Sequence, residues 1–429
     1  MKYGIFFVIL VLFLSSCGDK NVVQPKDYTT YLLPHYVDSA VESNNTEMSF
    51  WQSRLEIDST SFVNLLEAGY QHLGLFKLKG KIDDLRTGDS LIKLAARNLN
   101  NTDPDILQAL SQVAITQHQF KEAGVLNRQA YEKEGSPFIH ALLSFDVDME
   151  LGDFYNAKGK LDVLKNKQSF DYLIREAKYQ DHIGNLDGAI ELMENAFAQV
   201  ASTNKKALYC WALSNLGDMY GHAGRIEEAY SAYLSVLQKD PAYVYALKGI
   251  AWIAFSYDGN VAEAKKILNF INSVSDDPAI YLSLAEIAAY ENDIKAKERY
   301  IQLFLNTVEN PAYGDMYNKA LIEIYTGDKT DLAKALQLAT KEVENRPTPE
   351  TYTWLAWVHY KMGNISEAYN LFVLHVKGRT FEPEASMVGA YIMKEAGKEE
   401  ASQKYYEECL SSRFELGPEK MGALNEAMQ

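Results

Sequence analysis

Apolar residues recur every three or four positions along most of the chain, in runs separated by short turns. In one such run Leu213, Leu216 and Tyr220 share a face, and Ile226 and Tyr233 share a face in the next. This spacing is typical of amphipathic helices that bury one side. The pattern predicts an all-α chain in which the helices follow one another in pairs.

The helix pairs repeat with a common period, which two residue types report independently. Alanines early in the second helix recur at intervals of 32 to 40 residues, with one interval of 71 that spans a looser copy. They are Ala123, Ala157, Ala189, Ala229, Ala264, Ala335, Ala368 and Ala401. Prolines recur similarly, and most follow an Asp, Ser, Asn or Thr that is able to cap a helix. They are Pro104, Pro137, Pro241, Pro278, Pro311, Pro349, Pro383 and Pro418. The agreement indicates an internal repeat of about 34 residues.

The repeat resembles the tetratricopeptide repeat in residue type and spacing. The best copy contains Leu216, Gly217, Tyr220, Ala229, Tyr233 and Pro241. Two further copies contain Leu355, Ala356, Ala368 and Phe372, and Val388, Gly389, Ala401 and Tyr405. The resemblance implies a right-handed superhelical solenoid of about nine or ten repeats, whose first helices line a concave groove.

The repeat boundaries divide the chain into five parts. Residues 1–16 are expected to be a signal peptide, 17–35 an irregular tether, 36–58 a leading helix, 59–411 the solenoid, and 412–429 a capping helix. The resemblance to the repeat is weakest in the first helix pair, residues 59–100, where the segment KLKGKIDD is expected to be irregular.

The N-terminus resembles the signal of a bacterial lipoprotein. Lys2 precedes ten apolar residues, Ile5–Leu14, and Leu14-Ser15-Ser16-Cys17 resembles a lipobox. A bilayer span takes about 20 residues, so this run fits an export signal instead. The resemblance implies that Cys17 carries the lipid, and Gly18 after it favours the outer membrane. An ordinary signal peptide with a chance cysteine, or a short anchor, is the alternative.

Charge and cysteine content narrow the function further. With 58 acidic and 42 basic residues the formal net charge is −16, which argues against nucleic acid because its phosphates need Lys and Arg. Cys210 and Cys409 are far apart in sequence and are expected to be isolated, packed thiols rather than a disulfide.

Three closely spaced glycines raise the question of a phosphate-binding turn. Gly217 recurs as a small residue in other copies, where helices cross, and its expected partner is Ala229. Gly224 recurs where the first helix ends and is expected in the left-handed conformation. Gly221 has no counterpart in the other repeats. Because no strand and no P-loop Lys accompanies them, a nucleotide site is not expected.

Catalytic and metal-binding motifs are not evident in the sequence. The eight histidines are scattered, and Asp181 with His182, or Asp218 with His222, comes nearest to an acid–base pair. No cofactor, metal or catalytic residue is therefore predicted. An envelope enzyme that depends on Asp218 or His222 is the least favoured hypothesis.

Large aromatic residues recur at the groove-facing positions of the first helices and are candidates for partner binding. The predicted groove residues are Trp211, Asp218, Tyr245, Lys248, Trp252, Phe255, Trp357 and Tyr360. The leading hypothesis is a non-enzymatic scaffold, anchored to an envelope membrane through Cys17, that binds an envelope protein or peptide in this groove. The alternative is a surface lipoprotein that captures glycans or nutrients, like the helical starch-utilisation type, with the same aromatics as sugar platforms.

Overall fold

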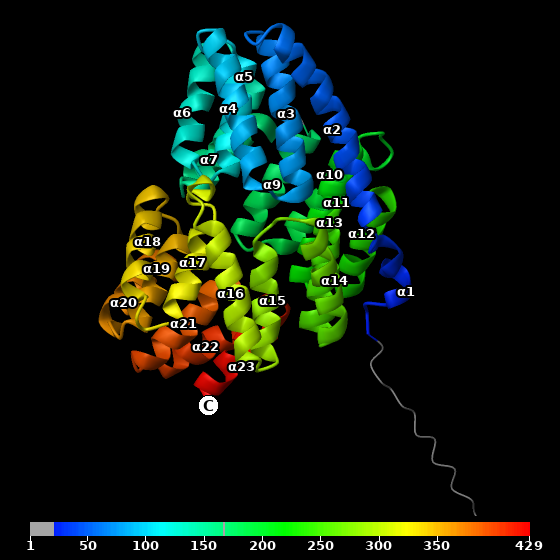
Figure 1. Ribbon diagram of the computed structural model, residues 1–429. Coiled ribbons are helices and arrows are strands. Elements are labelled where there is room, and N and C mark those ends of the chain that lie inside the picture. The colour runs from blue at the N-terminus through cyan, green and yellow to red at the C-terminus, as the bar shows by residue number, and fades with distance from the viewer. Residues whose placement is uncertain (1–20, 166–167) are drawn as a thin grey trace, which may run out of the picture.

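The computed structural model describes residues 21–165 and 168–429, and within these ranges the regular structure is helical, without strands (Figure 1). Ten helix pairs follow one another, and each helix packs mainly on its neighbour in sequence. The pairs are α3 (Phe62–Lys79) and α4 (Ile82–Asn98), α5 (Pro104–Thr116) and α6 (Phe120–Glu132), α7 (Pro137–Glu150) and α8 (Phe154–Leu164), α9 (Phe170–His182) and α10 (Leu186–Ala201), α11 (Lys206–His222) and α12 (Ile226–Lys239), α13 (Val244–Trp252) and α14 (Val261–Val274), α15 (Ala279–Tyr290) and α16 (Ile294–Val308), α17 (Asn318–Thr326) and α18 (Leu332–Asn345), α19 (Pro349–Lys361) and α20 (Ile365–Leu371), and α21 (Pro383–Glu395) and α22 (Glu399–Ser411). The predicted all-α solenoid of helix pairs is confirmed.

Shorter elements complete the chain. Two π-helices, η3 (Ile253–Tyr257) and η5 (Phe372–Val376), extend α13 and α20. A 3₁₀ turn, η4 (Pro311–Tyr313), precedes α17. The remaining elements lie outside the pairs: α1 (Pro25–Tyr28), η1 (Thr29–Tyr31) and α2 (Pro34–Ile57) before them, and α23 (Arg413–Met428) after them.

The repeated proline begins an α-helix at Pro104, Pro137, Pro349 and Pro383, as predicted, whereas Pro241 lies three residues before α13 and Pro418 lies inside α23. Before α5, α7 and α19, the side chains of Asp103, Ser136 and Thr348 accept hydrogen bonds from first-turn N–H groups at 3.0 to 3.4 Å. Each of these helices has Pro at its first position, where no intrahelical N–H is needed.

Glycines set the packing inside the pairs. A Cβ at Gly217 would lie 2.9 Å from the Tyr233 ring, so the glycine makes room for an aromatic ring of α12. The expected contact with Ala229 is therefore wrong. Gly224 has φ +72° and ends α11 in the left-handed region, which confirms its predicted role.

The expectation of an irregular segment in the first helix pair is wrong. Only a tight turn at Gly80, with φ +75°, separates α3 from α4, so KLKGKIDD is not irregular.

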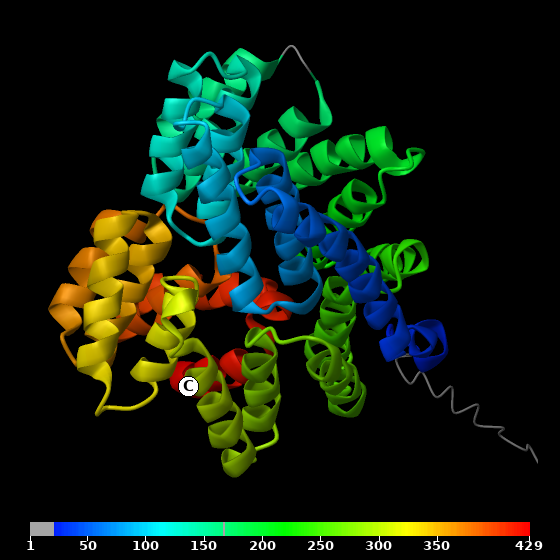
Figure 2. The same cartoon turned by 45° about the horizontal axis from the view of Figure 1, so that its top comes forward.

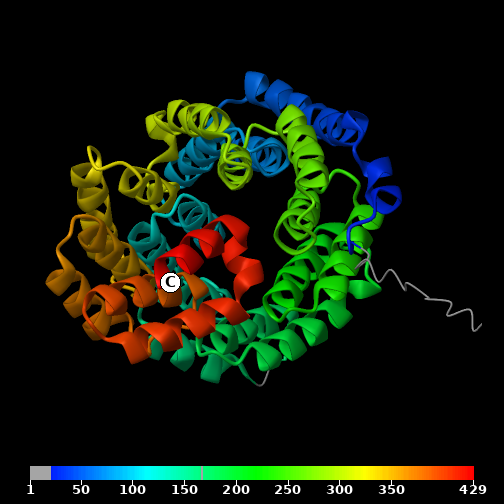
Figure 3. The same cartoon turned by 90° about the horizontal axis from the view of Figure 1, so that it is seen from below.

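The solenoid curls until early and late pairs touch, and its helices form a ring (Figures 2 and 3). The Arg86 side chain donates to the Ala312 carbonyl oxygen, 226 residues away, and Lys121 donates to that of Glu344, 223 residues away. The Asp276 N–H donates to the Lys79 carbonyl oxygen at 2.6 Å. One superhelical turn therefore takes six to seven helix pairs, and the next turn packs against it.

The N-terminal part of the described chain is not an irregular tether. Signal residues 1–16 and Cys17 lie outside the described residues, but residues 22–31 pack against α12 and α14. Val23 and Tyr28 are 1% and 0% exposed and belong to the largest core cluster of the solenoid. The leading helix α2 then packs on α3.

The C-terminal helix α23 does more than cover the last pair. Its Leu416, Met421 and Leu424 pack with Met387 and Cys409 of that pair. It also contacts α11, η3 and α15, so it lies on the inner side of the ring (Figure 3). A kink at Gly417, with φ +77° and ψ 162°, separates its first residues from the rest.

Two further findings concern the cysteines and the length of the helices. Cys210 and Cys409 are both buried and unpaired, as predicted. Among the described residues, no helix combines the length and apolar character that crossing a membrane requires.

Candidate binding groove

A cavity of about 530 Å³ lies on the concave side, between the first helices α11, α13 and α15 and the start of α23. Its lining includes five of the predicted groove residues, namely Asp218, Tyr245, Lys248, Trp252 and Phe255. Residues Phe414 and Glu415 of α23 close one side. The repeat spacing thus brings these predicted side chains together around one space, which the chain's own C-terminus narrows.

Asp218 is the polar centre of this cavity. Its carboxylate accepts hydrogen bonds from the hydroxyls of Tyr233, at 2.5 Å, and Tyr245, at 2.7 Å. Burial raises the pKa of Asp218, because the charged form loses solvation, and the two hydrogen bonds oppose that shift. Asp218 is therefore held by phenolic donors and has no direct hydrogen bond to His222, the partner considered for an acid–base pair.

Lys248 is engaged by the solenoid itself. It forms an ion pair with Asp277, whose other carboxylate oxygen accepts a hydrogen bond from the Tyr317 hydroxyl at 3.2 Å. Despite burial, Lys248 and these hydrogen bonds lower the pKa of Asp277. The amine thus links α13 to the loop before α15.

Phe255 presents no free aromatic surface, and Trp252 is partly covered by α23. The Trp252 indole N–H donates to the Phe414 carbonyl oxygen at 3.0 Å, and the Ser256 hydroxyl donates to the same oxygen at 2.7 Å. Phe255 is only 2% exposed and packs edge-on against Trp252 and Tyr290. Part of the groove that the sequence assigns to a partner is thus filled by α23.

The contact with α23 explains Gly221. A Cβ at this position would lie 2.8 Å from the Phe414 ring, so the glycine makes room for that ring on α11. Its lack of a counterpart in other repeats follows, because only this repeat receives Phe414.

The predicted residues of the later repeats form a second, separate cluster. Trp357 and Tyr360 stack with 5.1 Å between ring centroids, and Tyr391 lies 5.4 Å from Trp357. The Lys361 amine lies 5.2 Å from the Trp357 ring, within cation–π range. A cavity of about 250 Å³ is lined by Trp357, Lys361 and Tyr391.

Trp211 joins neither cluster. It is 38% exposed on α11 and contacts Phe170 edge-on, with 6.0 Å between ring centroids. Trp211 remains accessible, and so does Tyr245, which is 45% exposed at the cavity.

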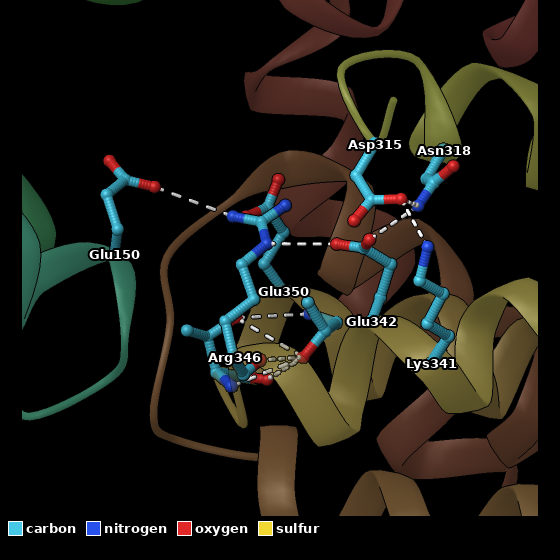
Figure 4. Close-up of polar contacts among 9 residues, drawn as sticks. Glu150, Asp315, Asn318, Lys341, Glu342, Arg346 and Glu350 are labelled. Carbon is cyan, nitrogen blue, oxygen red and sulfur yellow. Dashed lines mark hydrogen bonds and ion pairs between the residues drawn. The ribbon is translucent and has the colours of Figure 1, made fainter. Parts of the chain in front are cut away.

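Charged residues line a third cavity of about 720 Å³, where early and late pairs meet. Arg346 connects the charged side chains of the early and late pairs (Figure 4). The Arg346 guanidinium contacts Glu342 and Glu350 at 3.2 Å and reaches Glu150 of α7 at 3.5 Å. Asn318 holds the other oxygen of Glu342 at 2.7 Å. This network joins α7 to α18 and α19, so it stabilises the ring rather than offering free charges.

Sequence reasoning missed the contributions of α23 and the charged network. Gly221 was the one local signal for Phe414, because a glycine without a repeat-wide role indicates a close approach by another segment. Glu150 and Arg346 are 196 residues apart in sequence and no motif relates them, so no local signal pointed to their contact.

Comparisons with known proteins found similar solved structures only at low sequence identity. No family model matches the chain, and no curated protein does. A human IFIT1 dimer with PPP-AAAA is similar over 73% of this chain and 71% of its own, with 14% identity and a TM-score of 0.45. Yeast Tom70 is similar over 86% and 94%, with 15% identity and a TM-score of 0.33. A tetratricopeptide repeat protein from Parabacteroides merdae ATCC 43184 is similar over 61% and 98%, with 15% identity and a TM-score of 0.34. The ten helix pairs of the described residues give the chain a tetratricopeptide-type fold.

Proposed function

We propose that the chain is a non-enzymatic interaction scaffold, anchored by a lipid on Cys17 to a bacterial envelope membrane, and that it binds an envelope protein at the concave groove. The fold supports a scaffold, because helix-pair solenoids present long concave surfaces to partners. The lipobox-like sequence before Cys17 supports the anchor.

One observation carries the proposed binding site. Tyr245 is 45% exposed at the 530 Å³ cavity while its hydroxyl is fixed by Asp218. A tyrosine held in one orientation offers contact area without losing much rotamer freedom on binding, which favours it as an anchor for a partner. Trp211, on the first helix α11 of the preceding pair, adds a second accessible aromatic side chain.

Site-specific photocrosslinking in the envelope tests the site. A photoreactive residue at Tyr245 should capture a discrete protein, and Trp211→Ala should lower the yield. The matched control is a photoreactive residue at Tyr155, which is 89% exposed on α8, away from the cavity. Equal capture at both positions, or no capture at Tyr245, would contradict a groove partner.

Fractionation tests the anchor separately. The Cys17→Ser chain should leave the membrane fraction, and mass spectrometry should find a lipid on Cys17 of the native chain. A membrane-bound Cys17→Ser protein, or an unmodified native N-terminus, would remove the anchor from the proposal.

A further inference from the structure

The N-terminal segment is fastened to the solenoid at one particular turn. The N–H groups of Val22 and Val23 each donate at 2.9 Å to a different carboxylate oxygen of Asp258, in the turn between η3 and α14. The Gln24 N–H donates to the Tyr230 hydroxyl at 3.1 Å. Two backbone donors on one carboxylate are charge-assisted bonds, which are stronger than neutral ones.

From that turn the segment follows α14 along its length. Tyr28 is hydrogen-bonded to Glu263, in the first turn of α14, and Val37 packs with Val274 at the other end of the helix. The following helix α2 has 24 residues, so it extends about 36 Å to Ile57. The described part of the chain therefore starts beside the turn that precedes α14, and α2 leads away from it (Figure 1).

Only five peptide units separate Cys17 from Val22. Even a fully extended chain spans at most ~3.6 Å per residue, so the two Cα atoms lie within about 18 Å of each other. A long tether would let the solenoid turn freely, but a lipid on Cys17 with this reach holds the Asp258 turn close to the membrane.

The edge around Asp258 carries exposed aromatic and apolar side chains beside the exposed acidic residues Glu291 and Asp293. The neighbouring turn between α15 and α16 is joined to α14 by the ion pair of Lys265 with Glu291, at 2.5 Å. Three large apolar or aromatic side chains are exposed on the two turns: Tyr257 at 50%, Tyr290 at 44% and Ile294 at 57%. Tyrosines favour the interface between headgroups and water, where the ring is partly apolar and the hydroxyl stays wet.

We propose that the edge formed by residues 257–260 and 290–294 faces the phospholipid surface and sets the orientation of the solenoid on the membrane. This inference rests on the proposed lipid anchor and adds to it a specific face. Its occupant is a lipid surface, because the short link from Cys17 leaves this edge next to the bilayer. The far end of α2, whose last residue is Ile57, then points away from the membrane (Figure 1).

Fluorescence quenching on vesicles tests the orientation with the full-length lipidated chain. Ile294→Cys and Ile57→Cys each provide one exposed thiol for a fluorophore, because Cys210 and Cys409 are buried. On phosphatidylcholine vesicles with headgroup spin labels, the label at position 294 should be quenched several-fold more than that at 57. Ile57 is the matched control, since it is an isoleucine exposed at 84%.

Two further variants separate this inference from the anchor. Asp258→Ala should leave the protein on the vesicles but reduce the difference in quenching between positions 294 and 57. The Cys17→Ser chain reports on the anchor alone through loss of vesicle binding. Equal quenching at both positions in a vesicle-bound native chain would overturn the proposed orientation while the anchor stands.

Discussion

Both terminal segments pack on the pair α13 and α14, but different interactions hold them there. The N-terminal segment is fastened at Asp258 through backbone N–H groups, and the C-terminal segment is fastened two residues earlier, at Ser256, through its Phe414 carbonyl oxygen. The π-helix η3 contains Ser256 and ends next to Asp258. A single irregular turn of helix thus holds both the first and the last described segments of the chain.

The two attachments differ in how much side-chain packing supports them. Phe414 packs against Trp252 and into the space left by Gly221, and α23 continues into a core cluster with the last pair. The N-terminal segment contributes two deeply buried side chains, Val23 and Tyr28, around its polar contacts. Packing at a glycine is sensitive to each added atom, whereas a carboxylate that binds N–H groups is sensitive to its charge. The C-terminal attachment should therefore respond more strongly to substitution.

The largest expected effect is at the kink of α23. Gly417→Val places a β-branched residue at φ +77°, and even its Cβ would lie 2.7 Å from both the Trp252 ring and Glu286 Oε1. Left-handed strain and overpacking each cost about 1–3 kcal/mol, so the free energy of unfolding should fall by roughly 3 kcal/mol or more. Urea unfolding measures it. Gly422→Ala, in the same helix with open space around it, is the control and should be neutral or slightly stabilising.

A smaller effect is expected where Phe414 meets α11. Gly221→Ala brings a Cβ to 2.8 Å from the Phe414 ring and should cost about 2 kcal/mol by overpacking. Phe414→Ala removes the ring, so the alanine at 221 should add little cost in that background. A double-mutant cycle on unfolding free energies measures this coupling. Additive effects of the two substitutions would show that Phe414 is not the reason for the glycine.

The carboxyl of Glu286 makes the C-terminal attachment depend on pH. Burial raises the pKa of Glu286 from 4.5 to about 7, with Lys420 opposing the shift and Glu419 and Glu323 adding to it. Its Oε1 is buried without a hydrogen-bond partner. Because the folded state binds this proton more tightly than the unfolded state, the free energy of unfolding falls as pH rises from about 4.5 to about 7.

Glu286→Gln isolates this contribution. At 1.36 kcal/mol per pKa unit the full shift corresponds to about 3 kcal/mol, and partial solvent access reduces the expected effect to about 1–2 kcal/mol. Relative to the native chain, the variant should therefore be more stable at pH 8 by about that amount than at pH 5. Parallel pH profiles of unfolding free energy for both chains would contradict the raised pKa.

The sequence predicted whatever depends on the local repeat and little that depends on contacts between its turns. Period and caps gave the helix pairs, and Gly224 ends α11 as predicted, because each depends on neighbours within one repeat. Five of the predicted groove residues line one cavity because the repeat places the same face of successive first helices side by side. The ring closure by Arg346 and the position of Phe414 depend on superhelical curvature, which accumulates from small rotations between pairs and leaves no local pattern.

The smallest expected effect on stability is at the N-terminal attachment, where the substitution should release only the first described segment. Asp258→Ala removes the acceptor of the Val22 and Val23 N–H groups, and losing hydrogen bonds to a charged group costs about 1.5–3 kcal/mol when the donors stay buried. Since the segment 22–31 can open locally while the solenoid stays folded, only about 1 kcal/mol should be lost globally. Hydrogen exchange followed by mass spectrometry should show faster exchange in residues 22–31 and unchanged protection in α23. Faster exchange in α23 as well would mean that η3 couples the two attachments and does not hold each end independently.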